Sequence, residues 1–162
     1  MKAVVVYFSL NGHTKAVAEA VASKLGAELL RLEPRRAYPK STPMQMVVGG
    51  FESTFGCARG LKPHRFGQKK YDLVVLASPI WAGKLAPPMR KFLKAHRLGE
   101  MPVGLVVCCA GGKTEAARGT MKSRAKNVVA ELEVVDPNIK AAGKVRPDID
   151  AFCGKLKVKH AV

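Results

Sequence analysis

The sequence predicts an α/β protein with three layers, in which a doubly wound sheet of five parallel strands lies between helices. Two observations lead to this prediction. Short apolar runs alternate five times with segments whose apolar residues recur at helical spacing. The strongest runs are apolar throughout, as in strands buried on both faces of a parallel sheet. At 162 residues, the chain fits a single domain, 1–162.

The first strand–loop–helix unit is the clearest in the chain. Residues 4–8 (VVVYF) form a β-branched and aromatic run typical of a buried strand. The small and polar loop at residues 9–14 follows, and apolar residues then recur at helical spacing as far as Leu25. Gly26 is placed to end that helix.

The loop of this unit has the composition of an anion site. A helix that begins there presents free backbone N–H groups and the positive end of its dipole. Ser9, Asn11 and Thr14 add side-chain donors, so a phosphate monoester is the expected ligand. The loop matches neither G-x-x-x-x-G-K-[ST] nor G-x-G-x-x-G, which argues against ATP-type and Rossmann dinucleotide sites. An ordinary turn with Thr14 as N-cap is the alternative.

The next part of the chain is harder to interpret. Residues 27–33 predict a second strand, closed by a proline. Thr42 is expected to cap a short helix, which Gly49-Gly50 would interrupt and which Phe51, Phe55 and Cys57 would then continue on one face. Residues 59–70 are rich in Gly, Lys and Arg and predict a surface loop.

Two further strands have unusual exit loops. Residues 71–77 predict a third strand, and the loop at 78–84 after it holds the only tryptophan. A helix then opens with Pro87-Pro88, where first-turn N–H groups have no helical partner. Residues 103–109 predict the fourth strand, which ends in a glycine-rich loop at 110–113.

The last part of the chain completes the alternation. A helix is expected from Thr114, with an apolar stripe that extends to Val128. Residues 131–135 predict a fifth strand at the sheet edge. The remaining elements are expected to be a connector at 138–145, a closing helix around 149–156 and a frayed tail at 157–162.

The three unusual loops are expected to meet. Ligands of such sheets bind beyond the carboxyl ends of the strands, near the point where strand order reverses. The loops at 9–14, 78–84 and 110–113 all follow strands and would crowd one edge of the sheet. One ligand with a phosphate and a flat ring system would account for all three.

The charge of the chain is unusual. Twenty-eight Lys and Arg residues against 12 Asp and Glu residues give a net charge of +16, spread along the sequence. This excess favours anionic cofactors, acidic protein partners or nucleic acid, although a solvated basic surface with no dedicated partner is an equal alternative.

Other features of the composition narrow the function classes. No apolar run is long enough for a membrane helix, and no signal-peptide pattern is present, so we expect a cytoplasmic protein without membrane contact. The four cysteines include no C-x-x-C pair, so free thiols are expected rather than disulfides or a metal site. Cys108 and Cys109 are expected on opposite faces of a strand.

These motifs resemble those of the flavodoxin family. YFSLNGHTKAVAEAVA is similar to the family's phosphate loop and first helix, and SPIWAGKLAPPMRKFL is similar to its segment after the third strand. VVCCAGG is similar to the loop that lines the other side of the flavin. The resemblance implies a flavodoxin-like fold of the short-chain type, with strand order 2-1-3-4-5 and FMN as cofactor. Asn11 departs from the family pattern, which has a hydroxyl residue there, but its amide can still donate to phosphate.

The resemblance also implies which residues contact FMN, and no residue is expected to act as acid, base or nucleophile. The phosphate loop would contribute Ser9, Leu10, Asn11, Gly12, His13 and Thr14. The ring system would contact Pro79, Ile80, Trp81, Ala82, Gly83 and Lys84, although a core position is the alternative for the tryptophan. The pyrimidine edge would contact Cys109, Ala110, Gly111 and Gly112.

Three functions follow from these expectations. The first is an electron carrier that docks to a redox partner protein with an acidic surface. The second is an NAD(P)H-dependent flavin or quinone reductase, for which no nicotinamide motif is readable. A nucleic-acid-binding module is the weakest, because few aromatic residues lie among the basic ones. A phosphoacceptor receiver is excluded, since Ser9 and Asn11 stand where acidic residues would be needed.

Overall fold

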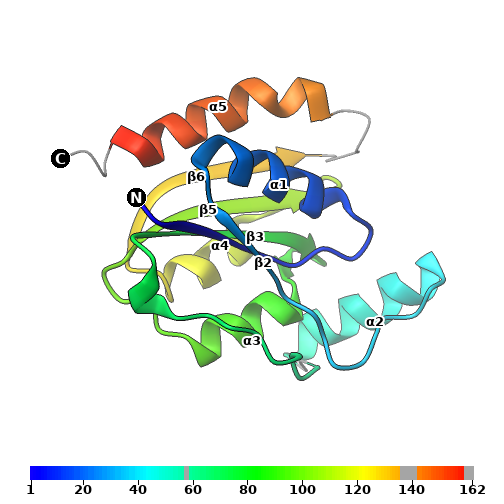
Figure 1. The fold of residues 1–162 in the computed structure, drawn as a ribbon. Helices are drawn as coiled ribbons and strands as arrows, with labels where there is room; N and C mark the ends of the chain where they lie inside the picture. The colour runs from blue at the N-terminus through cyan, green and yellow to red at the C-terminus, as the bar shows by residue number, and fades with distance from the viewer. Residues whose placement is uncertain (57–58, 136–141, 159–162) are drawn as a thin grey trace.

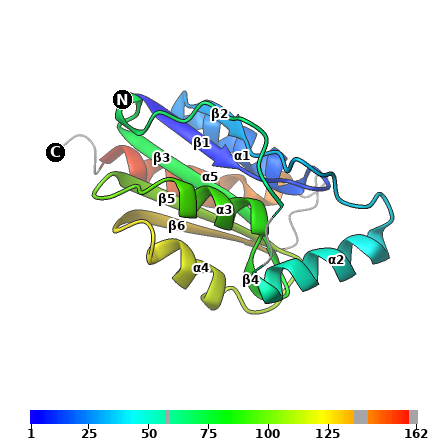
Figure 2. The same cartoon turned by 90° about the horizontal axis from the view of Figure 1, so that it is seen from below.

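A parallel sheet forms the centre of the computed structural model, which describes residues 1–56, 59–135 and 142–158. Along the sheet the five parallel strands follow the order β2-β1-β3-β5-β6, which confirms the predicted order 2-1-3-4-5. Figure 2 shows them side by side. The strands are β1 (Ala3–Tyr7), β2 (Glu28–Arg31), β3 (Leu73–Trp81), β5 (Pro102–Cys109) and β6 (Asn127–Val135).

Helices cover both faces of the sheet, as the three-layer prediction requires. In Figure 1, α1 (His13–Leu25) and α5 (Ala142–Val158) lie above it, while α3 (Pro87–Ala95) and α4 (Glu115–Lys122) lie below. The remaining helix, α2 (Thr42–Phe55), projects from the right-hand side of that view, and a short 3-10 turn at Gln68–Lys70 precedes β3. Within the described residues, no helix combines the length and the apolar character needed to cross a bilayer.

The core lies on both faces of the sheet because strand side chains alternate between them. In β1, Val5 and Tyr7 pack toward the layer of α1 and α5. Val4, Val6 and Phe8 pack toward the layer of α3 and α4. All of these side chains are buried, which explains why the run is apolar at every position.

Strand pairing moves several predicted boundaries. β2 is shorter than the predicted 27–33, whereas β3 continues beyond Ala77 because Ser78 and Pro79 still pair with β5. β6 begins at Asn127, opposite Pro102, instead of at residue 131. The prediction that Val128 belongs to the preceding helix was therefore wrong, since α4 already ends at Lys122.

A short hairpin at the end of β3 was not predicted. Trp81 pairs with Lys84 in the two-residue strand β4 (Lys84–Leu85), which runs antiparallel to β3. Ala82 and Gly83 make the turn with φ of 49° and 71°. Two successive positive φ values are typical of a type I′ turn, which suits the twist of a two-residue hairpin.

Helix α2 corrects the interpretation of the middle segment. It runs without a break through Gly49 and Gly50 to its C-cap at Gly56, so the predicted interruption was wrong. Its N-cap is Ser41 rather than Thr42: the Met44 backbone N–H donates to the Ser41 hydroxyl at 3.4 Å. The predicted position of Cys57 lies outside the described residues. Residues 59–67 are irregular, as predicted.

The closing helix is longer than predicted. α5 begins at Ala142, so the predicted connector is wrong from residue 142 onward, and residues 138–141 lie outside the described part. At the other end, residues 157–158 are helical, and the rest of the predicted tail is likewise not described. Gly104 of β5 lets this helix approach, because a Cβ there would lie 2.9 Å from Phe152 Cζ.

Candidate functional site

A cavity of about 520 Å³ opens at the carboxyl ends of β1, β3 and β5. The segment after each of these strands contributes to its wall, as the topology predicts, and α2 contributes a further side. The lining residues are Ser9, Leu10, Asn11, His13, Thr14, Thr42, Gln45, Gly50, Pro79, Ile80, Trp81, Ala82, Cys108, Cys109 and Ala110.

Most of the sequence-predicted site residues line this cavity. The first loop contributes all of its predicted members except Gly12, the β3 segment contributes Pro79 through Ala82, and the β5 exit contributes Cys109 and Ala110. Five predicted residues do not line it, and their contact with a cofactor stays a prediction. These are Gly12, Gly83, Lys84, Gly111 and Gly112.

The first loop places the N-terminus of α1 at the cavity. The helix begins at His13 after Gly12, which has φ of 89°, and no side chain in the described ranges caps it. Thr14 lies inside the first turn and is buried, so the alternative of a turn capped by Thr14 is wrong. The Ser9 hydroxyl oxygen accepts from the Gly12 backbone N–H at 3.1 Å, which fixes the loop and leaves the Ser9 proton free to donate.

The electrostatics of the cavity suit an anion. Among the residues that the structure describes, none that lines the cavity is acidic, so no described carboxylate opposes a negative group there. None of these described lining residues is Lys or Arg either. Attraction for an anion must therefore come from the dipole and free N–H groups of α1, with neutral donors such as Asn11 around them.

Trp81 forms an aromatic wall of the cavity. Its ring meets Phe8 edge-on at a centroid distance of 5.5 Å and Tyr38 edge-on at 5.1 Å. Gly49 of α2 lies against the indole, since a Cβ at that position would lie 2.9 Å from Trp81 Cε3. The tryptophan is partly buried, and it contributes to the core and to the cavity at once.

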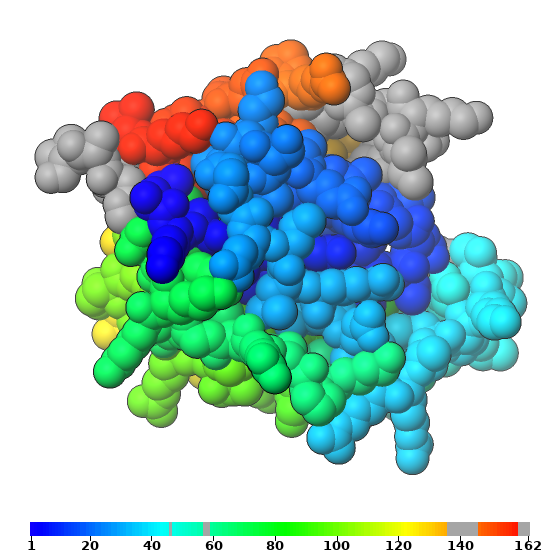
Figure 3. Space-filling view, viewed as in Figure 1, coloured from blue at the N-terminus to red at the C-terminus, as the bar shows by residue number. Residues whose placement is uncertain are grey.

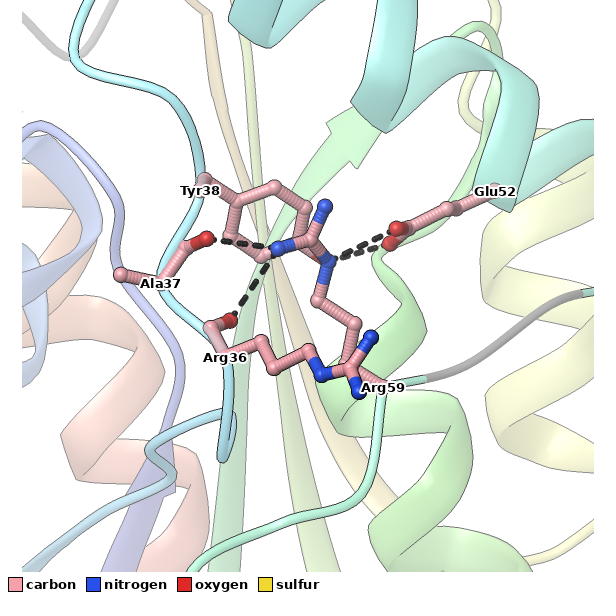
Figure 4. A network of polar contacts seen from close by, with 5 residues as sticks. All are labelled: Arg36, Ala37, Tyr38, Glu52 and Arg59. Atoms are coloured by element: carbon pink, nitrogen blue, oxygen red, sulfur yellow. Dashed lines mark hydrogen bonds and ion pairs between the residues drawn. The ribbon is translucent and has the colours of Figure 1, made fainter.

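A polar network holds α2 against the loop that precedes it (Figure 4). The Tyr38 hydroxyl donates to Glu52 at 2.9 Å, and Arg59 Nε donates to the other Glu52 oxygen at 2.7 Å. Arg59 also donates to the carbonyls of Arg36 and Ala37, and its guanidinium lies 4.5 Å from the centre of the Tyr38 ring. Burial and the nearby Glu52 carboxylate raise the pKa of Tyr38, so its hydroxyl stays a donor.

Two neighbouring cysteines, Cys108 and Cys109, line the cavity. Cys108 and Cys109 are both buried and free, as predicted, and Cys153 is also free. Burial raises the pKa of the Cys108 thiol to about 12, although a hydrogen bond with Thr14 acts in the opposite direction. Cys108 is therefore protonated at neutral pH and unreactive. Among the described residues, no three His, Cys, Asp or Glu side chains are placed to share a metal ion.

The predicted residues outside the cavity are nearby in the fold. The Lys84 amine donates to the Thr54 carbonyl of α2 at 3.4 Å, so this side chain reaches the C-terminal turn of that helix. Gly83 completes the hairpin turn close to the backbone of Lys113. Gly111 and Gly112 have φ of 124° and 111°, values that L side chains rarely adopt.

Four lining residues were missed by sequence reasoning: Thr42, Gln45, Gly50 and Cys108. Cys108 had a usable signal, because it stands beside Cys109 at the end of a strand whose exit loop was already implicated. No sequence signal pointed to the three residues of α2. Their helix follows the irregular segment after β2, and no local pattern places that helix beside the carboxyl edge of the sheet.

Comparison with solved structures identifies the fold. A flavoprotein from Lactobacillus acidophilus in complex with FMN matches with a TM-score of 0.71 and 20% identity, over 88% of this chain and 97% of that chain. A flavodoxin from the domain Archaea matches with a TM-score of 0.56 and 18% identity, over 97% of this chain and 99% of that chain. A flavodoxin from Streptococcus pneumoniae TIGR4 matches with a TM-score of 0.56 and 16% identity, over 98% of this chain and 99% of that chain. No protein-family model and no curated protein matches the sequence.

The chain therefore has the flavodoxin-like fold. The strand order agrees with this assignment, and the matches cover most of both chains in each comparison. At identities of 16–20% the likeness establishes the architecture, and the ligand and activity must be argued from the residues of this chain.

Proposed function

We propose that this protein binds FMN without a covalent bond and transfers electrons through it. The observation that carries the proposal is the meeting of three loops around one cavity, each at the carboxyl end of a parallel strand. Its volume, about 520 Å³, falls within the range of small-molecule and cofactor sites. The L. acidophilus flavoprotein, which shares the fold, was crystallised with FMN.

The residues present fit the two ends of FMN. The uncapped N-terminus of α1, with Ser9, Asn11 and Thr14, would hold the phosphate through neutral donors and backbone N–H groups. At the other end, Trp81, Pro79 and Ile80 offer an apolar and aromatic wall to a flat ring system. When bound, FMN supplies the redox chemistry, and the protein supplies position, electrostatics and exclusion of water.

Flavin binding is tested directly by the absorption spectrum of the purified protein and by titration of the apoprotein with FMN. We expect FMN to bind more tightly than riboflavin, because riboflavin lacks the phosphate that α1 would hold. Failure of FMN to bind would contradict the proposal. Equal affinity for the two flavins would contradict the assignment of the first loop.

The proposed role is that of an electron carrier, with a redox partner protein whose docking surface is acidic. The net charge of +16 supports this choice of partner, since opposite charges speed the encounter of two proteins. The reductase remains the second candidate because the same charge suits the phosphates of NADPH. Steady oxidation of NADPH with a quinone, without any added reductase, would establish the reductase in place of the carrier.

A further inference from the structure

Helix α2 carries an apolar stripe that points away from the protein. Four large side chains of this helix are more than half exposed: Met44 at 51%, Val47 at 66%, Phe51 at 58% and Phe55 at 67%. Their spacing places them along one face of the helix. The two phenylalanine rings contact each other, with centroids 4.5 Å apart. We call these four residues the α2 stripe.

The face of α2 that meets the protein carries mainly small and polar residues, together with Val48, which packs against the core. Gly49 and Ser53 are buried there, Glu52 joins the network with Tyr38 and Arg59, and the Gln45 amide donates to the Pro39 carbonyl at 2.7 Å. A surface helix normally turns its apolar stripe toward the core. Here four large apolar side chains point outward instead, and an exposed apolar patch of this kind marks an interaction site.

Charge indicates what covers the stripe. The segment between Lys40 and Arg59 is the longest in the sequence without a lysine or arginine, in a chain that has 28 of them. The other long segments without cations belong largely to the buried strands of the sheet. The single charged residue of the helix, Glu52, is turned inward and paired with Arg59 at 2.7 Å. The α2 stripe itself is thus neutral on a strongly cationic molecule, with the Lys84 amine beside its C-terminal end, at the Thr54 carbonyl.

We propose that the α2 stripe is the contact surface between two copies of this chain. Two molecules of charge +16 repel one another across most orientations, and a cation-free apolar face is where they can approach closely. An isologous dimer brings the same patch together from both copies. In an antiparallel pair of helices, Phe55 of one copy would lie near Met44 of the other. The space-filling view shows α2, in cyan, protruding at the right-hand edge, where a second molecule can reach it (Figure 3).

Two other occupants fit the residues less well. An acidic protein would be recognised by exposed cations, and the helix itself carries none. A membrane-surface helix has lysine and arginine on its polar face, which α2 also lacks. None of these observations involves the cofactor, so the dimer proposal does not depend on FMN binding.

Analytical ultracentrifugation of the full chain tests the proposal. Between about 5 and 500 μM protein, we expect the mass to rise from 17.4 kDa toward twice that value. Raising NaCl from about 0.15 M to 0.5 M should strengthen the association, because salt screens the repulsion between like charges and leaves apolar contacts in place. Contact with an acidic partner would have the opposite salt dependence.

Variants locate the contact. Phe51→Lys should raise the dimer dissociation constant at least about tenfold, and Val47→Lys should do the same, because each places a cation inside the apolar interface. Val135→Lys is the matched control: Val135 is 59% exposed and belongs to β6, not to the α2 stripe, so this variant should dimerise like the parent. Circular dichroism of each variant establishes that it is folded.

Three results would overturn the proposal. One is a monomer at every concentration and salt level. Another is a dimer that both Phe51→Lys and Val47→Lys leave unchanged. The third is a monomer that binds vesicles of phosphatidylcholine and phosphatidylserine through the α2 stripe, which would assign this surface to a membrane instead.

Discussion

At the scale of single residues, the candidate site binds an anion with neutral groups. Asn11 and His13 line the cavity beside the first turn of α1, and within the described part of the chain no Lys, Arg, Asp or Glu side chain lines it. Backbone N–H groups and the helix dipole therefore provide much of the attraction. A negative charge introduced next to such a site should therefore lower its affinity for an anion.

Asn11→Asp is predicted to weaken FMN binding at least about tenfold. The substitution keeps the size of the side chain but replaces a donor with a carboxylate that repels the phosphate, and hydrogen bonds to charged groups contribute about 1.5–3 kcal/mol. Titration of the apoprotein with FMN, followed by flavin fluorescence, measures the change.

Asn11→Ser is the control for this variant. Serine keeps a neutral donor at the same position, so it should retain most of the affinity. If Asn11→Asp binds FMN as tightly as the parent, the phosphate does not lie at the N-terminus of α1.

At the scale of secondary-structure elements, the contact between α2 and β3 depends on a missing side chain. Gly49→Ala would place a Cβ 2.9 Å from Trp81 Cε3 and 3.1 Å from Cζ3. Phe8 and Tyr38 pack against the same indole, which limits how far it can shift. The variant is predicted to lower the free energy of unfolding by about 1–3 kcal/mol, measured by urea denaturation. The fluorescence of Trp81, the only tryptophan, should change as well.

The neighbouring glycine provides the control. A Cβ at Gly50 would meet no atom of the described residues within 4 Å, so Gly50→Ala should raise the free energy of unfolding by about 0.5–1 kcal/mol through helix propensity. Trp81 fluorescence should not change in this variant. If both substitutions stabilise the protein equally, Gly49 is not needed for the approach of Trp81.

The loop before β3 is joined to the end of α3 through two histidines. His64 Nε2 lies 3.2 Å from His96 Nε2, and His64 Nδ1 lies 3.1 Å from the Lys62 carbonyl. Because Nδ1–H of His64 donates to that carbonyl, its Nε2 accepts from Nε2–H of His96. Burial lowers the pKa of His96, and the charge of His64 lowers it further.

This lowered pKa predicts a pH dependence of stability. The unfolded chain binds a proton at His96 near pH 6.5, whereas the folded protein resists protonation until a lower pH. The free energy of unfolding should therefore fall as pH drops from about 7 through 6.5 toward the folded pKa. Urea denaturation at a series of pH values measures the slope.

His96→Gln should flatten that slope, and His13→Gln, a histidine on a different element, should leave it in place. NMR titration of the histidine ring protons reports the pKa of His96 itself. An unchanged slope in His96→Gln would show that another group is responsible.

At the scale of the whole molecule, the net charge is predicted to affect the flavin potential. Reduced FMN is anionic, and a field of +16 favours that form over the oxidised one. The potential of the last reduction step should therefore be less negative than in acidic flavodoxins. Raising the salt concentration should make it more negative, because salt screens the field.

Redox titration of the FMN-loaded protein at low and high salt measures this effect. Acidic flavodoxins are the comparison, since their potential should shift in the opposite direction with salt. A potential as low as theirs and independent of salt would contradict the prediction.

Local patterns in the sequence determined most of the fold and much of the candidate site. A buried parallel strand must be apolar on both faces, and an amphipathic helix must repeat every three to four residues, so each unit from β1 to α5 is visible along the chain. The loops after β1, β3 and β5 then meet because parallel strands place their carboxyl ends at one edge. That rule predicts that Asn11, Trp81 and Ala110 lie around one cavity, as they do in the structure.

Only the tertiary structure decided the role of α2 and the exact strand limits. Whether Gly49 and Gly50 break a helix depends on the partner that the helix meets, and here Trp81 requires the absence of a side chain at Gly49. The apolar stripe of α2 predicts a buried face, yet contacts of Tyr38 and Arg59 with Glu52 turn it outward. These partners come from distant parts of the sequence, and no local pattern records which residues the folded chain brings together.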